Sequence, residues 1–266
     1  MAHYNLGVVL THKGQVDEAI AECREAIRIK KDYAEAHCSL GELLEKIGRF
    51  SEALAYRQRG HEIGSKNPRW PYPSAQWVRN CERLVELDDK LPAIVSGQKQ
   101  PADSAECLAL AQFCQLPCKR QHLAAKRFYS QAFAEKPSLA DDLDSQHRYN
   151  AACAAALAGC GQGADTDKLD DKECARLRQQ ALDWLRTDLR AYRQLMEKSA
   201  GKAGPAIAQR MQHWLQDGDF AGMRGAESLG KLPEAERKEW QKLWEEVEAL
   251  RERASQLPKT TKSARP

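Results

Sequence analysis

The sequence lacks the features that direct a protein into a membrane or out of the cell. It contains no run of about 18 apolar residues, the length that a membrane-spanning helix needs. Its first five residues, Met-Ala-His-Tyr-Asn, have neither the basic region nor the apolar core of a signal peptide. The nine cysteines are scattered and odd in number, so we expect reduced thiols in a cytoplasmic protein.

An excess of charge of one sign is also lacking. The chain of 266 residues has 41 basic and 38 acidic side chains, a net charge of +3. This balance argues against a nucleic-acid partner and against an anionic membrane surface. Catalytic patterns are missing too: there is no His-Arg-Asp loop, no Asp-Phe-Gly, and no histidine set beside a nucleophile. We therefore expect a protein that is not an enzyme and that holds no cofactor or metal.

What the sequence does contain is a pattern that recurs after 34 residues, which is the period of the tetratricopeptide (TPR) repeat. The residues that define the two copies are Leu6, Gly7, Ala19 and Ala26, then Leu40, Gly41, Ala53 and Gly60. On these residues the chain resembles the TPR family. The resemblance implies paired antiparallel helices that bind other proteins.

The spacing of the small residues has a physical reason. Glycine and alanine at a helix crossing let the two axes approach to about 8–10 Å, so Gly7 and Ala19 are expected to face each other. Leu6 is expected to fill the seam around that crossing. Gly14 and Gly48 are expected to end the first helix of each repeat in a left-handed cap.

No stretch alternates apolar and polar residues for long, so strands are not expected. The predicted fold class is all-α, a TPR-type α-solenoid of antiparallel helical hairpins with irregular later repeats. The predicted regions are two TPR repeats (1–66), a Pro-rich turn with a capping helix and connector (67–102), two degenerate TPR-like hairpins (103–200), C-terminal helices (201–257) and a disordered tail (258–266).

Several elements within these regions can be placed more finely. Ser74 is a plausible N-cap for a helix that Pro92 should end. Long helices are expected over about 171–198, 205–216 and 233–255. Tryptophans at helical spacing beside leucine favour a core and not a base-stacking platform. These are Trp184, Trp214, Trp240 and Trp244.

A narrower resemblance rests on residues 90–103, 148–163 and 231–237. Together they are similar to the C-terminal TPR tails of planctomycete-type bacterial serine/threonine protein kinases. The kinase domain that precedes these tails is absent from the sequence, so the resemblance implies a non-catalytic signalling tail. It favours a Met1 that is an internal start of a longer product. A free-standing adaptor is the alternative.

Cys114, Cys118 and His122 are spaced by four residues and could share a helix face that binds Zn²⁺, with Cys107 one step earlier. Pro117 interrupts that helix, so these side chains are interpreted as packing residues. An enzyme-accessory or metal-binding helical domain is kept as a second hypothesis.

The glycines at 159, 161 and 163 suggest a phosphate loop, but no strand precedes them. The acidic residues 165–171 match no calcium loop. The segment is therefore predicted to be a solvated linker.

The peptide groove of some TPR proteins binds acidic C-terminal tails through basic helix positions. The matching positions here are Tyr4, Val8, Cys38 and Glu42, none of which is basic. The predicted lining of the groove is Tyr4, Val8, Thr11, Cys38, Glu42 and Glu45. The sequence thus predicts a scaffold for a neutral or basic protein segment, with self-association as a further possibility.

Overall fold

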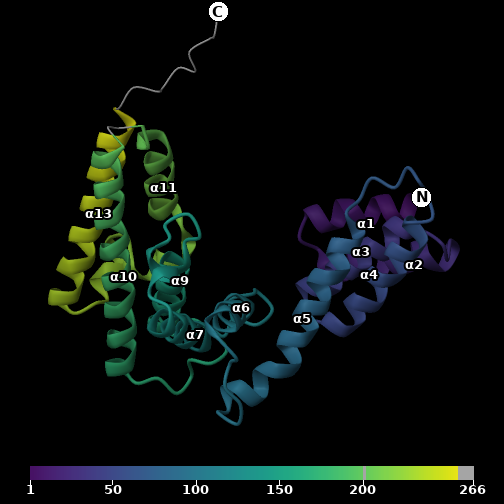
Figure 1. The fold of residues 1–266 in the computed structure, drawn as a ribbon, viewed down its shortest axis with the longest axis horizontal. Helices are drawn as coiled ribbons and strands as arrows, with labels where there is room; N and C mark the ends of the chain where they lie inside the picture. Colours follow the sequence, from purple (N-terminus) through teal and green to yellow (C-terminus); the bar gives the residue numbers. More distant parts are fainter. Residues whose placement is uncertain (200–201, 257–266) are drawn as a thin grey trace, which may run out of the picture. The chain divides into compact units, whose positions relative to one another are not determined.

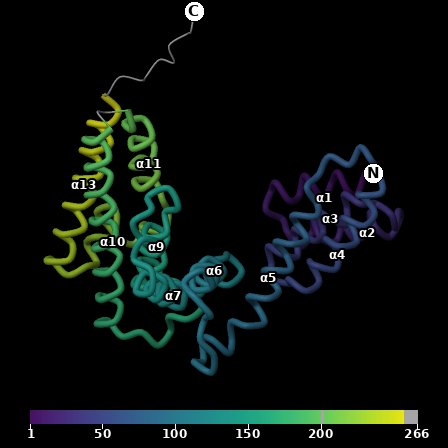
Figure 2. Tube along the Cα trace, in the orientation of Figure 1, coloured from purple at the N-terminus to yellow at the C-terminus, as the bar shows by residue number. Residues whose placement is uncertain are grey.

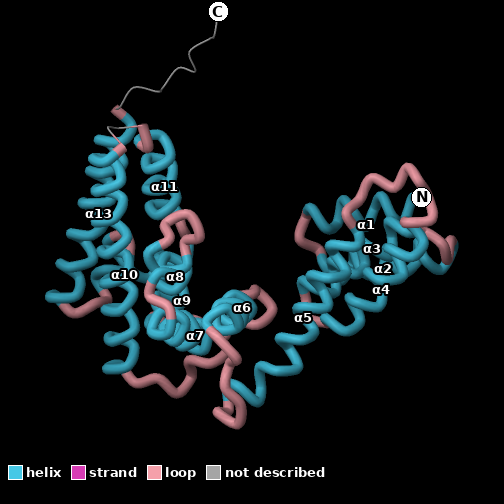
Figure 3. The backbone as a smooth tube through the Cα atoms, in the orientation of Figure 1, coloured by secondary structure: helices cyan, strands magenta, loops and turns pink. Residues whose placement is uncertain are grey.

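The computed structural model describes residues 1–199 and 202–256, and all regular structure in these ranges is helical (Figures 1 and 3). The predicted all-α class is confirmed. The chain forms two compact units: unit 1 is residues 1–100 with 116–119, and unit 2 is residues 101–115 with the chain from 120 onward. The predicted disordered tail, residues 258–266, lies outside the described residues.

Unit 1 contains two helical hairpins followed by a longer helix. Its helices are α1 (Ala2–His12), α2 (Val16–Ile29), α3 (Ala34–Lys46), α4 (Phe50–Gly64) and α5 (Ser74–Val95). Neighbouring helices in sequence pack on one another throughout, as in stacked repeats. Gly14 (φ 75°) and Gly48 (φ 80°) end α1 and α3 in the predicted left-handed conformation.

The helices of unit 1 approach closely where their side chains are smallest. A Cβ atom on Gly7 would lie 3.4 Å from the carbonyl oxygen of Ala19, which confirms the predicted crossing of α1 and α2. A Cβ on Gly60 would lie 2.4 Å from the Sγ of Cys38 and 3.0 Å from the carbonyl oxygen of Ala34. Only glycine fits at this contact between α3 and α4 without displacing backbone.

Three expectations for unit 1 were wrong. Leu6 is 47% exposed, because no helix of the described chain covers its face of α1, whereas its repeat partner Leu40 is fully buried against α2. Pro92 does not end α5, because the helix continues for three residues beyond it. The Pro92 carbonyl accepts a hydrogen bond from the Ser96 N–H at 3.0 Å. Ser74 begins α5 as a helical residue, and its hydroxyl accepts a hydrogen bond from the Trp70 indole instead of capping the helix.

Arg57 occupies a helix position where the TPR pattern has a bulky apolar residue. It is buried, and its stem packs on Gly41, whose Cβ would lie 2.8 Å from the Arg57 Cγ. The guanidinium donates to Glu45 at 2.7 Å and lies 5.1 Å from the Trp77 ring centre. The aliphatic stem thus replaces the usual apolar side chain, while the charge is paired and stacked.

Unit 2 is a larger helical assembly. Its elements are α6 (Ser104–Cys114), α7 (His122–Glu135), α8 (Ser138–Asp141), α9 (His147–Gly159), α10 (Asp171–Lys198), α11 (Gly204–Gln216), the 3₁₀ helix η1 (Gly218–Met223), α12 (Ala226–Gly230) and α13 (Glu234–Ser255). The three long helices that were predicted near the C-terminus are α10, α11 and α13, which neighbour one another (Figure 2). A capping box of Asp170 and Glu173 begins α10.

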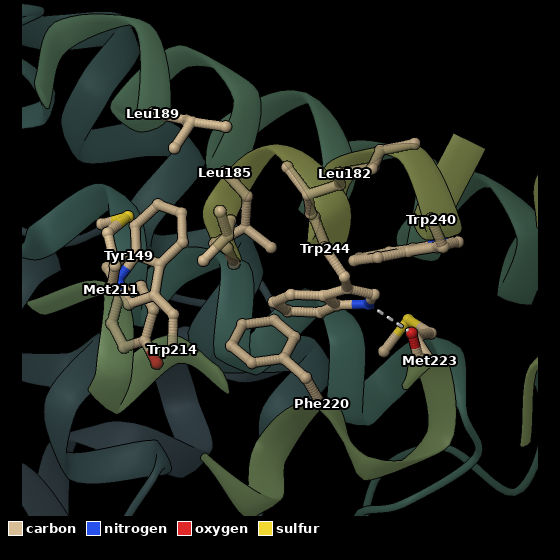
Figure 4. Packing of buried hydrophobic residues seen from close by; sticks show 14 of the residues in the cluster. Tyr149, Leu182, Leu185, Leu189, Met211, Trp214, Phe220, Met223, Trp240 and Trp244 are labelled. Atoms are coloured by element: carbon tan, nitrogen blue, oxygen red, sulfur yellow. Dashed lines mark hydrogen bonds between the residues drawn. The ribbon is translucent and has the colours of Figure 1, made fainter. Parts of the chain in front are cut away.

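Aromatic, leucine and methionine side chains fill the core of unit 2 (Figure 4). Trp214 and Trp240 are fully buried, and the Trp244 indole donates to the Met223 carbonyl at 2.7 Å. The alanine-rich stretch 151–158 of α9 is almost entirely buried, so that α7 and α10 pack directly on it. The predicted core position of these tryptophans is confirmed, although Trp184 is only half-buried.

A buried ion pair joins α9 to α10 in the same unit. The Arg148 guanidinium donates to Asp188 at 3.0 Å, and both side chains are buried. It also bonds the exposed Asp141. Burial raises the pKa of Asp188 to about 7 against the opposing pull of Arg148. The pair is therefore fully ionised only above neutral pH.

We predict that Asp188→Ala lowers the free energy of unfolding of unit 2 by about 3–5 kcal/mol at pH 8, because it leaves the Arg148 charge buried without its inner partner. Native-state hydrogen exchange at the amides of α9 and α10 measures this change. Asp183→Ala, at an exposed site on the same helix, should change it by no more than about 0.5 kcal/mol. Equal effects of the two variants would contradict the prediction.

We also predict that Gly159→Ala destabilises unit 2. The new Cβ would lie 2.6 Å from the Arg178 Cγ and 3.0 Å from backbone atoms of Arg178 and Cys174. Overpacking of this kind typically costs about 1–3 kcal/mol. The control is Gly218→Ala, where a Cβ meets nothing within 4 Å. The midpoint of thermal unfolding should fall for Gly159→Ala alone, and a rise would refute the close crossing.

Candidate functional site

Four of the six predicted groove residues line two concavities of unit 1, and Val8 and Thr11 line neither. Tyr4, Cys38 and Glu42 line a pocket of about 50 Å³ together with Glu35, Ser39, Arg57, Trp70, Tyr72 and Trp77; we call it the aromatic pocket. Val8 and Thr11 lie outside it, and the Thr11 hydroxyl donates to the Gly7 carbonyl at 2.8 Å. Glu45 is bound to Arg57 and lines the other concavity.

That other concavity is a mainly apolar hollow of about 530 Å³. It lies among the end of α3, the start of α4, α5 and the segment 116–118. Phe50 and Leu84 supply apolar surface, while Glu42, Glu45 and Lys46 form its charged edge. Glu42 is therefore the one predicted groove residue that lines both concavities.

The aromatic pocket owes its shape to the Pro-rich segment 66–73. Trp70 packs directly on Gly64, where a Cβ would lie 2.4 Å from the indole, and its Nε1 donates to the Ser74 hydroxyl at 2.9 Å. The centre of the Tyr72 ring lies 4.8 Å from the ring centre of Trp70 and 5.9 Å from the ring centre of Trp77. These aromatic residues were not predicted as lining. In the sequence they are two aromatic residues among three prolines, a pattern that predicts a turn and not a binding surface.

The electrostatics of the aromatic pocket favour a positive charge. Glu35 and Glu42 supply carboxylates, of which Glu42 is paired with Lys46 at 3.0 Å, and the Arg57 charge is already engaged by Glu45 and Trp77. Burial raises the pKa of the Tyr4 hydroxyl, and neighbouring Tyr72 and Glu35 raise it further. The pocket thus combines neutral rings and anionic groups, the surroundings that attract ammonium and guanidinium groups.

The cysteine-based zinc pattern does not assemble. Cys107 and Cys114 are fully buried, and the Cys114 thiol contacts the Gln121 side chain. Within the described residues, one set of potential metal ligands has its ligand atoms within 4.8 Å of one another: Cys153, Asp217 and Asp219. These residues stand 64 and 66 positions apart, so no spacing in the sequence marks them.

The loop after α9 was predicted to be a solvated linker, and this is only partly right. Gly161 turns the chain with φ 68° and is exposed. Asp165, however, accepts backbone hydrogen bonds from Leu123 at 3.2 Å and Ala124 at 2.9 Å. It caps the N-terminus of α7, where a carboxylate is stabilised by the unpaired N–H groups and the helix dipole.

Comparison with protein families adds one match: the model described as TPR repeat matches residues 7–48. This match supports the resemblance of the chain to the TPR family. It covers the second half of α1, α2 and α3, a segment that includes the crossing glycines Gly7 and Gly41. No curated protein matches the chain. None of the helices in residues 1–199 and 202–256 combines the length and apolar character needed to cross a membrane.

The buried thiols of unit 1 generate a prediction on pH. Burial raises the pKa of Cys23 and Cys38 from 9.0 to about 11, and that of Cys81 to about 12. In the unfolded chain these thiols ionise near pH 9, so the unfolded state holds fewer protons above that pH. The free energy of unfolding of unit 1 should therefore fall as the pH rises from about 9 to about 11.

Hydrogen exchange at α2 and α3 over this pH range measures the fall. Cys23→Ala removes one of the titrating groups, so its stability should decline less steeply with pH than that of the wild type. Identical slopes would show that the Cys23 thiol does not contribute.

Proposed function

We propose that unit 1 is a non-catalytic protein–protein docking module whose aromatic pocket anchors a neutral or basic segment of the partner. The observation that carries the proposal is the convergence of Tyr4, Trp70, Tyr72 and Trp77 with the carboxylates of Glu35 and Glu42. The TPR match over residues 7–48 supports a role in protein binding, since TPR repeats generally mediate such interactions.

The size of the pocket limits what enters it. A water molecule occupies about 30 Å³, so a pocket of about 50 Å³ accepts the tip of one side chain and not a whole peptide turn. An ammonium or guanidinium group over aromatic faces gains about 0.5–2 kcal/mol. We propose that one Lys or Arg side chain enters, while the neighbouring residues of the partner lie along α1, α3 and α5.

An acidic partner tail is disfavoured for two reasons. The helix positions that would hold it carry Tyr4, Val8, Cys38 and Glu42, none of which is cationic. The one guanidinium at the pocket, that of Arg57, is buried and committed to Glu45. An incoming carboxylate would therefore face Glu35 and Glu42, and the nearby ammonium of Lys46 is already paired with Glu42 at 3.0 Å.

We further propose that the module works in cytoplasmic signalling, as the TPR tail or a detached fragment of a bacterial serine/threonine kinase. The support is the resemblance of residues 90–103, 148–163 and 231–237 to such tails. The DNA upstream of the Met1 codon tests this: an in-frame kinase domain is expected. A stop codon followed by a ribosome-binding site would favour a free-standing adaptor instead.

We predict that Tyr72→Ala weakens binding of a Lys/Arg-containing peptide about 2- to 30-fold, the equivalent of one lost cation–π contact. Tyr72 is 44% exposed, so its removal should leave the helices intact. Fluorescence anisotropy with three peptides of matched length, basic, neutral and acidic, measures the affinities. The basic peptide should bind most tightly and lose affinity with added salt.

Two controls make this experiment decisive. Glu35→Gln should lower the affinity for the basic peptide, whereas Glu52→Gln, at an exposed site on α4 outside the pocket, should leave it unchanged. Light scattering across a concentration series checks whether the groove serves self-association. Tight binding of the acidic peptide, or full affinity in Tyr72→Ala, would refute the proposal.

A further inference from the structure

A polar concavity of unit 2 has a volume of about 790 Å³. α9 brings Cys153 to its wall, and the junction of α11 with η1 brings Asp217 and Asp219. The Sγ of Cys153 and one carboxylate oxygen of each aspartate all lie within 4.8 Å of one another. Three groups that can each become anionic therefore meet at one point.

The local structure holds these groups in place. The Tyr149 hydroxyl donates to Asp217 Oδ2 at 2.6 Å, and the Asp219 backbone N–H donates to Asp217 Oδ1 at 3.0 Å. The Cys153 Sγ lies 4.0 Å from Asp217 Oδ2. Tyr149 is itself fixed by stacking on the fully buried Trp214, with ring centres 5.2 Å apart. The cluster thus joins the buried Cys153 to two partly buried aspartates, one of which is held by hydrogen bonds.

A second observation points to a ligand at the same place. His122, on α7, lines this cavity and is only 7% exposed, yet its Nδ1 has no hydrogen-bond partner. Cys153, Asp217 and Asp219 line the same cavity as His122. A buried nitrogen without a partner is costly, and a metal ion is a natural partner for neutral imidazole.

His213 approaches the cluster from α11. Its Nε2 lies 3.5 Å from Asp217 Oδ2, but its side chain is largely exposed.

We propose that Cys153, Asp217 and Asp219 form a binding site for a divalent transition-metal ion of the zinc class, in the cavity that His122 also lines. A thiolate with carboxylate oxygens suits Zn²⁺ or Co²⁺, whereas Mg²⁺ and Ca²⁺ prefer oxygen ligands alone. On binding, the Cys153 thiol releases its proton to water and its sulfur becomes a ligand. Tyr149 then acts as a positioning residue that orients Asp217.

The test uses the full chain and metal alone. The purified protein is analysed for bound metal, stripped with chelator and titrated with Co²⁺, whose thiolate charge-transfer absorption reports a Co–S bond. We expect saturation at one Co²⁺ per chain, loss of the band when Zn²⁺ is added, and a higher unfolding temperature with Zn²⁺. Absence of stoichiometric binding would overturn the proposal.

Variants locate the ion. Cys153→Ser should abolish the charge-transfer band, and Asp219→Asn should weaken Co²⁺ binding at least about tenfold while leaving the band. Tyr149→Phe should weaken it about 10- to 100-fold, as expected for a positioning residue. Cys107→Ser, at a buried thiol outside the cluster, is the matched control and should retain the band.

Asp219→Asn also guards against misfolding, because Asp219 is only half-buried and its replacement conserves shape. Far-UV circular dichroism verifies that each variant keeps its helices. A band that persists in Cys153→Ser, or one that disappears in Cys107→Ser, would show that the ion is bound elsewhere and would refute this site.

Discussion

Close approach of helix backbones at residues without bulky side chains holds both units together. In unit 1 the contact is that of Gly60 with Cys38 and Ala34, and in unit 2 it is that of Gly159 with α10. Small residues bury little apolar area themselves, so their role is geometric: they bring larger neighbours such as Leu40 and Trp214 into full burial. Since packed interiors tolerate little added volume, the positions of the pockets follow from these crossings.

Charges inside the two cores show what such packing permits. Arg57 and Arg148 are both buried, each with a carboxylate partner within 3.0 Å. A buried ion pair adds little net stability, yet loss of one partner is severe. In unit 1 the pair engages Arg57, which lines the aromatic pocket, so its guanidinium is not available to the partner that we propose for this pocket. The pocket that remains is aromatic and acidic.

The repeat of small residues was sufficient to predict the helical hairpins of unit 1, and tryptophan spacing predicted the core helices of unit 2. The predictions for Leu6 and Pro92 were wrong. A repeat period in the sequence shows neither which helix faces lack a neighbour nor how near a proline lies to the end of a helix. Trp70 and Tyr72 lie in a loop without periodicity. Cys153 and Asp217 meet through tertiary packing alone, so no local spacing predicts the metal-binding cluster.

The most direct measurement of the central claim is a double-mutant cycle between Gly60→Ala and Cys38→Ala. A Cβ on Gly60 would lie 2.4 Å from the Cys38 Sγ, so removal of that sulfur should relieve most of the strain. We expect the double variant to lose less free energy of unfolding than the sum of the losses in the two single variants, by well over about 0.5 kcal/mol. Effects that add within about 0.3 kcal/mol would contradict it, because α3 and α4 would then not be in contact at these residues.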